Sequence, residues 1–252
     1  MEKQKIVLGL IATLVCSSLM ISGCTQQNSP SDQNKPSTET VRQILEKAKT
    51  IESVYFEVNI SELSSGVPVQ NVTMKIWQKT PYMKENASYS YSDNTTNVSY
   101  IQRPEGIYQY VATQNKYVLY QEIGLPQLST GDVAEDLLNN QTITILGTES
   151  INGITTTVIQ YSSNESENST RTMKMWIWNE KGVPLKVFET RIRDEITITW
   201  DYQYLNYSFI DIPDSTFNVE ESNEKTPFIP SYFFSFFYKK RFLFNFIQQL
   251  SS

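Results

Sequence analysis

Apolar residues alternate with polar residues along most of the chain after Glu52. A period of two is typical of strands that bury one face, and it first appears over residues 54–60. Because turns of hairpin length, such as Asn152-Gly153, join several runs, we expect an antiparallel meander. Further strands are predicted at about 72–77, 82–91, 97–103, 106–112, 116–122, 142–149, 154–162, 170–178, 184–192 and 195–206.

A helical period precedes these strands. Ser37 or Thr38 can cap the N-terminus of this helix, and Glu39 lies in its first turn, where negative charge is favoured. A second short helix is predicted over 132–139. The first helix is predicted from five apolar residues spaced by three or four, which form one buried face: Val41, Ile44, Leu45, Ala48 and Ile51.

The beginning of the chain resembles the signal sequence of an exported lipoprotein. An apolar segment, residues 6–21, follows Lys3 and Lys5, and Ile21-Ser22-Gly23-Cys24 resembles a lipobox. An uncleaved membrane anchor is the alternative, but the apolar segment is shorter than the about 20 residues that a spanning helix needs. We therefore expect residues 1–23 to be removed and Cys24 to hold the chain, through a lipid, on the extracytoplasmic face of the cell membrane.

The rest of the chain divides into three parts. Residues 24–37 are the lipidated cysteine and a flexible polar linker, and residues 38–219 form one domain. Cleavage removes Cys16 and leaves Cys24 as the only cysteine, so no disulfide stabilises that domain. Residues 220–252 form an aromatic-rich tail, which is either an interfacial membrane segment or a disordered, non-native stretch without a selected role.

Composition argues against several classes of function. The chain has 21 basic and 27 acidic residues, which does not favour nucleic-acid binding. It has no histidine, the commonest general base and metal ligand. The sequence also lacks nucleophile elbows, phosphate loops and metal-ligand spacings. We therefore expect neither an enzyme nor a bound metal or cofactor.

A short internal repeat suggests which side chains face inward. Residues 73–77 and 172–176 read Thr-Met-Lys-Ile-Trp and Thr-Met-Lys-Met-Trp, although chance similarity between two amphipathic strands explains this equally well. Methionine suits an adaptable apolar site, but ordinary core packing is the alternative for each residue. The residues predicted to face a ligand cavity are Phe56, Val58, Ile60, Met74, Ile76, Met173, Met175 and Ile177.

Asn-x-Ser/Thr sequons are frequent. Their use as N-glycosylation sites would fit an archaeal cell surface and would place those residues in solvent. The alternative is that a chain rich in Asn, Ser and Thr forms sequons readily. The nine sequons begin at Asn59, Asn71, Asn86, Asn94, Asn97, Asn140, Asn164, Asn168 and Asn206.

The order of predicted elements resembles the LolA/LolB lipoprotein-carrier superfamily over about residues 38–219. Local sequences that carry this resemblance are 75–84, 147–153, 176–186 and 212–217. The resemblance implies a mainly β (α+β) fold, an antiparallel sheet curled into an open half-barrel with helices at the concave face.

It also implies a binding protein. The partner would be a lipid, a lipidated molecule or another hydrophobic ligand. A sensor of the cell envelope, or a domain that binds another envelope protein, is the alternative function. Shuttling between membranes is not expected of an anchored chain.

The lipid anchor can be tested directly. Cys24→Ser should abolish incorporation of a labelled fatty acid and move the chain out of the detergent phase in Triton X-114 partitioning. Cys16→Ser is the matched control, because this cysteine lies in the segment predicted to be cleaved. Equal labelling of the two variants would contradict the anchor.

Overall fold

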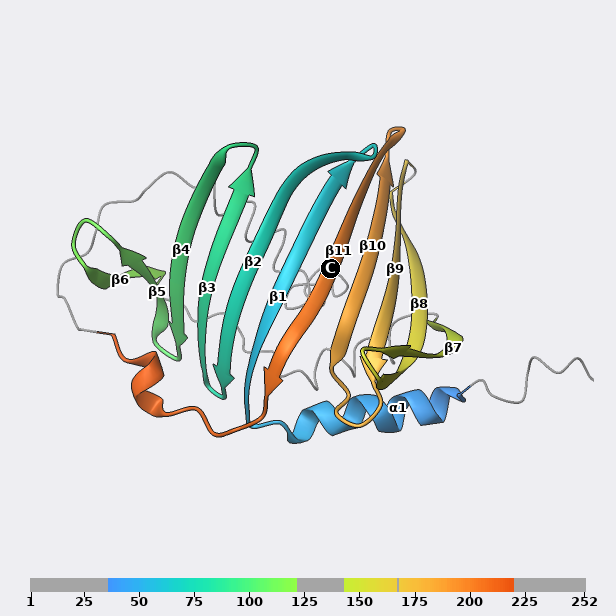
Figure 1. The fold of residues 1–252 in the computed structure, drawn as a ribbon, viewed down its shortest axis with the longest axis horizontal. Helices are drawn as coiled ribbons and strands as arrows, with labels where there is room; N and C mark the ends of the chain where they lie inside the picture. The colour runs from blue at the N-terminus through green and yellow to red at the C-terminus, as the bar shows by residue number, and fades with distance from the viewer. Residues whose placement is uncertain (1–35, 122–142, 167, 220–252) are drawn as a thin grey trace, which may run out of the picture. The chain divides into compact units, whose positions relative to one another are not determined.

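The described part of the chain forms an antiparallel sheet of eleven strands with one α-helix (Figure 1). A computed structural model describes residues 36–121, 143–166 and 168–219. The first elements are α1 (Thr38–Glu46), η1 (Lys47–Thr50), β1 (Ser53–Ser64), β2 (Val67–Lys79), β3 (Tyr82–Tyr91), β4 (Asn94–Arg103), β5 (Gly106–Val111) and β6 (Lys116–Gln121). They are followed by β7 (Ile143–Ile151), β8 (Ile154–Ser166), β9 (Ser169–Trp178), β10 (Pro184–Arg193), β11 (Ile196–Ser208) and η2 (Asp214–Phe217).

The sheet consists of two meanders that meet in its middle. The strand order is β6-β5-β4-β3-β2-β1-β11-β10-β9-β8-β7, and all neighbouring strands are antiparallel. Every pair except β1–β11 joins strands that are consecutive in the chain. The first and last strands therefore hold the two halves together.

One face of the sheet, called the core face below, carries a continuous row of apolar side chains. Its members pair directly across neighbouring strands, which is the arrangement in which side chains stabilise a sheet. Much of the row belongs to the largest apolar cluster of the described residues, called the main cluster below. From β7 to β3 the row consists of Ile145, Ile159, Met175, Val187, Tyr202, Ile60, Val72 and Tyr89.

Helix α1 packs at one end of the strands. Its N-cap is Ser37, whose Oγ accepts a hydrogen bond from the Thr40 backbone N at 3.1 Å. Its buried residues Val41, Ile44 and Leu45 belong to the main cluster. After Glu46 the chain tightens into the 3₁₀ turn η1, so the predicted helical face continues to the buried Ala48 in a different local geometry.

The opposite face of the sheet, called the second face below, has a smaller cluster of its own. After β11 the chain passes the end of the sheet, and Ile212 and Phe217 pack with Ile101 of β4. The Phe217 ring stacks on Tyr82 of β3 at 5.6 Å between centroids. Lys79 fixes this crossing, because its Nζ lies 2.9 Å from Asp211 and 2.8 Å from Asp214.

The predicted mainly β fold and antiparallel meander are confirmed. The sheet is open, since its outermost described strands, β6 and β7, do not pair with each other. Several helices at a concave face are not seen in the part of the chain that the structure describes, where α1 is the one α-helix. The predicted helix over 132–139, residues 1–35 and the tail from 220 lie outside the described residues.

Among the glycines of the described residues, Gly182 should tolerate substitution least. It has φ +76°, and an added Cβ would lie 2.9 Å from the Ala48 backbone N and closer still to the Ile44 carbonyl oxygen. Gly182→Ala should lower the free energy of unfolding by more than the roughly 1–2 kcal/mol expected for a left-handed alanine alone. Urea unfolding of the full chain measures this loss.

Gly153→Ala is the matched control. Gly153 has φ +81°, but an added Cβ there would meet no atom within 4 Å. Equal losses for the two variants would show that the contact between the β9–β10 turn and α1 is unimportant.

Candidate functional site

The structure brings the eight predicted cavity residues together on the core face. Six of them are buried members of the main cluster, while Ile60 and Met74 are partly buried and pack against it. The two segments of the internal repeat thus place Met74 and Met173 in the same cluster. Contact between these residues and a ligand stays a prediction.

An aromatic series leads from the main cluster toward the end of the sheet where α1 lies. Phe56 stacks with Tyr207 at 5.3 Å between centroids, and Tyr207 stacks with Phe209 at 5.7 Å. The rings of Trp178 and Phe209 pack edge to face at 5.9 Å between centroids. The Tyr207 hydroxyl donates to the Pro184 carbonyl oxygen at 2.7 Å, and burial raises the pKa of this phenol well above its usual range. Tyr207 therefore stays neutral and is held in place.

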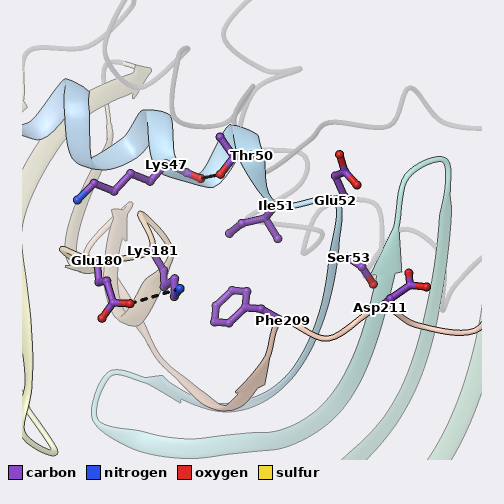
Figure 2. A pocket seen from close by; sticks show the side chains of 9 residues that line it. All are labelled: Lys47, Thr50, Ile51, Glu52, Ser53, Glu180, Lys181, Phe209 and Asp211. Carbon is purple, nitrogen blue, oxygen red and sulfur yellow. Dashed lines mark hydrogen bonds and ion pairs between the residues drawn. The ribbon is translucent and has the colours of Figure 1, made fainter.

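A pocket of about 520 Å³ opens at the end of this series (Figure 2). The turn between β9 and β10 supplies one side of it, and the segment from η1 into β1 and the residues after β11 supply the rest. Ile51 and Phe209 form an apolar floor, and both pack against the main cluster. The remaining lining residues are Lys47, Thr50, Glu52, Ser53, Glu180, Lys181 and Asp211.

Local hydrogen bonds position the side chains of the pocket. The Lys47 Nζ donates to the Asn179 carbonyl oxygen at 2.7 Å, which fastens η1 to the β9–β10 turn. Ser53 Oγ accepts from the Ile212 backbone N at 3.0 Å, which fastens β1 to the segment after β11. The Lys181 Nζ lies 5.3 Å from the centre of the Phe209 ring, within reach of a cation–π attraction.

None of the pocket residues was predicted from the sequence as a site, although Ile51 was assigned to the helical face. They come from three separate parts of the chain, and no motif connects them. A polar residue before a strand or in a turn is an ordinary feature, so the sequence carried no signal for the pocket.

A buried ion pair lies on the core face among these apolar residues. Arg171 Nε is 2.9 Å from Glu189 Oε1, and the two side chains are 5% and 1% exposed. Glu189 pairs across the sheet with Met173 and Trp200. Because a buried ion pair is costly unless its geometry is good, the short contact with Arg171 matters, and Arg191 Nη2 lies 3.9 Å from the same oxygen of Glu189.

The second face carries a charged cluster around Trp176 of the repeat. The Trp176 Nε1 donates to Glu149 Oε2 at 2.6 Å, and the Lys174 Nζ lies 4.4 Å from the centre of the indole ring. The hydrogen bond from Trp176, followed by the charge of Lys174, lowers the pKa of Glu149. Trp77 of the first repeat segment has a similar neighbour, the Lys84 Nζ at 5.7 Å. Ordinary packing accounts for both tryptophans, since Trp176 is buried and Trp77 packs against the cluster of Ile101, Ile212 and Phe217.

The sequons vary in accessibility. Asn86 is half-buried and accepts a hydrogen bond from Ser99 Oγ at 2.6 Å, while Asn140 lies outside the described residues. Use of any sequon stays a prediction. The exposed sequon residues are Asn59, Asn71, Asn94, Asn97, Asn164, Asn168 and Asn206.

Over residues 36–121, 143–166 and 168–219, no three His, Cys, Asp or Glu side chains come together as a metal site would require. The same residues contain no helix with the length and apolarity needed to cross a bilayer.

Removing one partner of the buried pair should cost far more than removing an exposed one. Arg171→Met should lower the free energy of unfolding by about 3–5 kcal/mol, and the double variant Arg171→Met, Glu189→Leu should recover most of that loss. Chemical denaturation of the full chain measures both.

Lys186→Gln provides the comparison. Lys186 pairs with Asp201 at 3.2 Å on half-exposed side chains, so its loss should cost less than about 1 kcal/mol. If Arg171→Met were no more damaging than Lys186→Gln, the buried pair would not matter to stability.

Comparisons with known proteins give weak structural similarities. No protein-family model and no curated protein sequence matches the chain. LprF from Mycobacterium bovis is similar with a TM-score of 0.44 and 15% identity, over 71% of this chain and 98% of LprF. Lipoprotein LppX from Mycobacterium tuberculosis is similar with a TM-score of 0.37 and 15% identity, over 66% and 92% of the two chains. A LolA superfamily protein from Nitrosomonas europaea has a TM-score of 0.33 and 13% identity, over 71% and 97%.

Proposed function

We propose that this chain is a membrane-anchored lipoprotein that binds a lipid or another amphiphile on the extracytoplasmic side, without catalysis. The pocket at the α1 end of the sheet carries the proposal. Its rim is charged, while its floor of Ile51 and Phe209 continues into the main cluster. A site with a charged rim and an apolar floor suits an amphiphile that has a polar head group and an apolar chain.

The dimensions agree with this proposal. Ligand pockets commonly have volumes of about 300–1,000 Å³, and this one has about 520 Å³. A whole lipid needs further space, so its acyl part would have to enter the main cluster. Four methionines there, Met74, Met83, Met173 and Met175, have flexible and polarizable side chains that can repack around such a chain.

The proposed anchor restricts where binding takes place. Fourteen linker residues, 24–37, reach roughly 20 Å if they behave as a flexible coil of about 5–6 Å times the square root of their number. The domain would therefore take up, hold or present its ligand close to one membrane.

A docking domain for another envelope protein is the second candidate. Exposed aliphatic side chains gather on the turns of two neighbouring hairpins, β1–β2 and β10–β11. Val67 is 64% exposed and Ile196 is 51% exposed. Ser65 N donates to the Thr197 carbonyl oxygen at 2.6 Å, which holds the two turns together. Such a paired apolar tip suits a protein contact.

Photolabelling tests the first candidate. The full lipidated chain would be placed in vesicles that contain a phospholipid with a diazirine near the end of one acyl chain. Irradiation should label β9, around Met173 and Met175, and the residues near Phe209. Ile51→Trp, which fills the pocket floor, should reduce the labelling of β9, and peptide mass spectrometry measures this.

Two controls make the test specific. Ile210→Trp adds the same ring at a residue that is 71% exposed and does not line the pocket, so labelling should not change. The pair Val67→Ser, Ile196→Ser should also leave it unchanged. Labelling that avoids β9 in the unaltered chain would argue against lipid binding and favour the docking domain.

A further inference from the structure

Charge divides the rim of the pocket. In Figure 2, Lys47, Lys181 and Glu180 lie on one side of Phe209 and Ile51, while Glu52, Ser53 and Asp211 lie on the other. The rim thus carries two cations, both on the first side, and three anions, two of them on the second side. A ligand that carried only negative charge would face the acidic side as well as the lysines.

The lysine side is positioned for an anion. Lys47 is held by the Asn179 carbonyl oxygen, so its ammonium stays near the β9–β10 turn. Lys181 lies over the Phe209 ring and pairs with Glu180 at 3.3 Å. Because Glu180 is 71% exposed, that ion pair is weak and can be exchanged for a ligand anion at little cost.

The acidic side is positioned for a cation. In the part of the chain that the structure describes, the Glu52 carboxylate makes no hydrogen bond or ion pair, whereas Asp211 is held by Lys79 at 2.9 Å. Both carboxylate oxygens of Glu52 are therefore available to bind a ligand ammonium. Ser53, the next residue, accepts a hydrogen bond from the Ile212 backbone N and can still donate its hydroxyl hydrogen.

We infer that the pocket binds a zwitterionic head group in which a phosphate and an ammonium are joined by a short linker, as in phosphoethanolamine. The phosphate binds Lys181 and Lys47, and the ammonium binds Glu52. Phe209 and Ile51 receive the glycerol and the first acyl carbons. This inference rests on the proposed function, since it names the polar part of the same ligand.

Head groups without acyl chains separate this inference from the proposed function. The probes are glycerophosphoethanolamine, a zwitterion, and glycerophosphoglycerol, an anion of similar size. The full lipidated chain would be held in vesicles of a neutral galactolipid that contain no phosphate. Saturation-transfer NMR would give the Kd of each probe, with empty vesicles as the blank.

Substitutions at Lys181 and at Glu52 should change the Kd of the two probes differently. Lys181→Gln should raise the Kd of both probes about tenfold, which is the loss of one charge-assisted contact. Glu52→Gln should raise the Kd of glycerophosphoethanolamine about tenfold and should not weaken glycerophosphoglycerol. The matched controls Glu46→Gln and Lys75→Gln, which are exposed and do not line the pocket, should change neither Kd.

Each other outcome overturns the inference. Equal binding of the two probes with no effect of Glu52→Gln would show a pocket for anions only. No saturable binding of either probe would show that the pocket receives no head group. If acyl photolabelling of β9 persisted in that case, the proposed function would stand and the head-group assignment alone would fail.

Discussion

The pairing of β1 with β11 is the constraint on which the rest of the structure depends. Residues 57–64 of β1 match residues 198–205 of β11, so the strands that come first and last along the described chain lie side by side in the middle of the sheet. Every other strand pair closes a local hairpin or a connection between consecutive strands. This single pairing brings Ile51 and Ser53, just before and at the start of β1, next to Phe209 and Asp211, just after β11. Without it there would be two meanders and no pocket.

The two faces of the sheet use charge in different ways. On the second face, lysines lie over tryptophan rings and remain in contact with water, where they cost little. On the core face, Arg171 and Glu189 are removed from water and pair with each other, and Arg191 lies 3.9 Å from the same carboxylate oxygen of Glu189. The pocket combines both situations, since its charged groups are exposed to water while its floor belongs to the apolar interior.

The periodic parts of the fold could be predicted from the sequence. The strands, the Ser37 cap and the inward direction of Phe56 and Val58 all follow from local periodicity, because one buried face imposes it. β10 shows where the pattern fails. Phe188 is 38% exposed and Glu189 is 1% exposed, so the apolar residue faces out and the charged one faces in. Arg171 on the neighbouring strand β9 makes that orientation acceptable, and the sequence does not reveal register between strands. The pocket could not be predicted for the same reason, because the pairing of strands assembles it from segments that are distant in the sequence.

The contact between α1 and the β9–β10 turn has a mechanical consequence. Gly182 lies against the backbone of α1, and Lys47 ties η1 to the same turn. A tether attached ahead of Ser37 would pull on α1 before it pulled on any strand. Part of the load would pass through these two contacts into Glu180 and Lys181, which form one side of the pocket, and the buried face of α1 would pass the rest to the main cluster. Tension on the tether would therefore act directly on one side of the pocket.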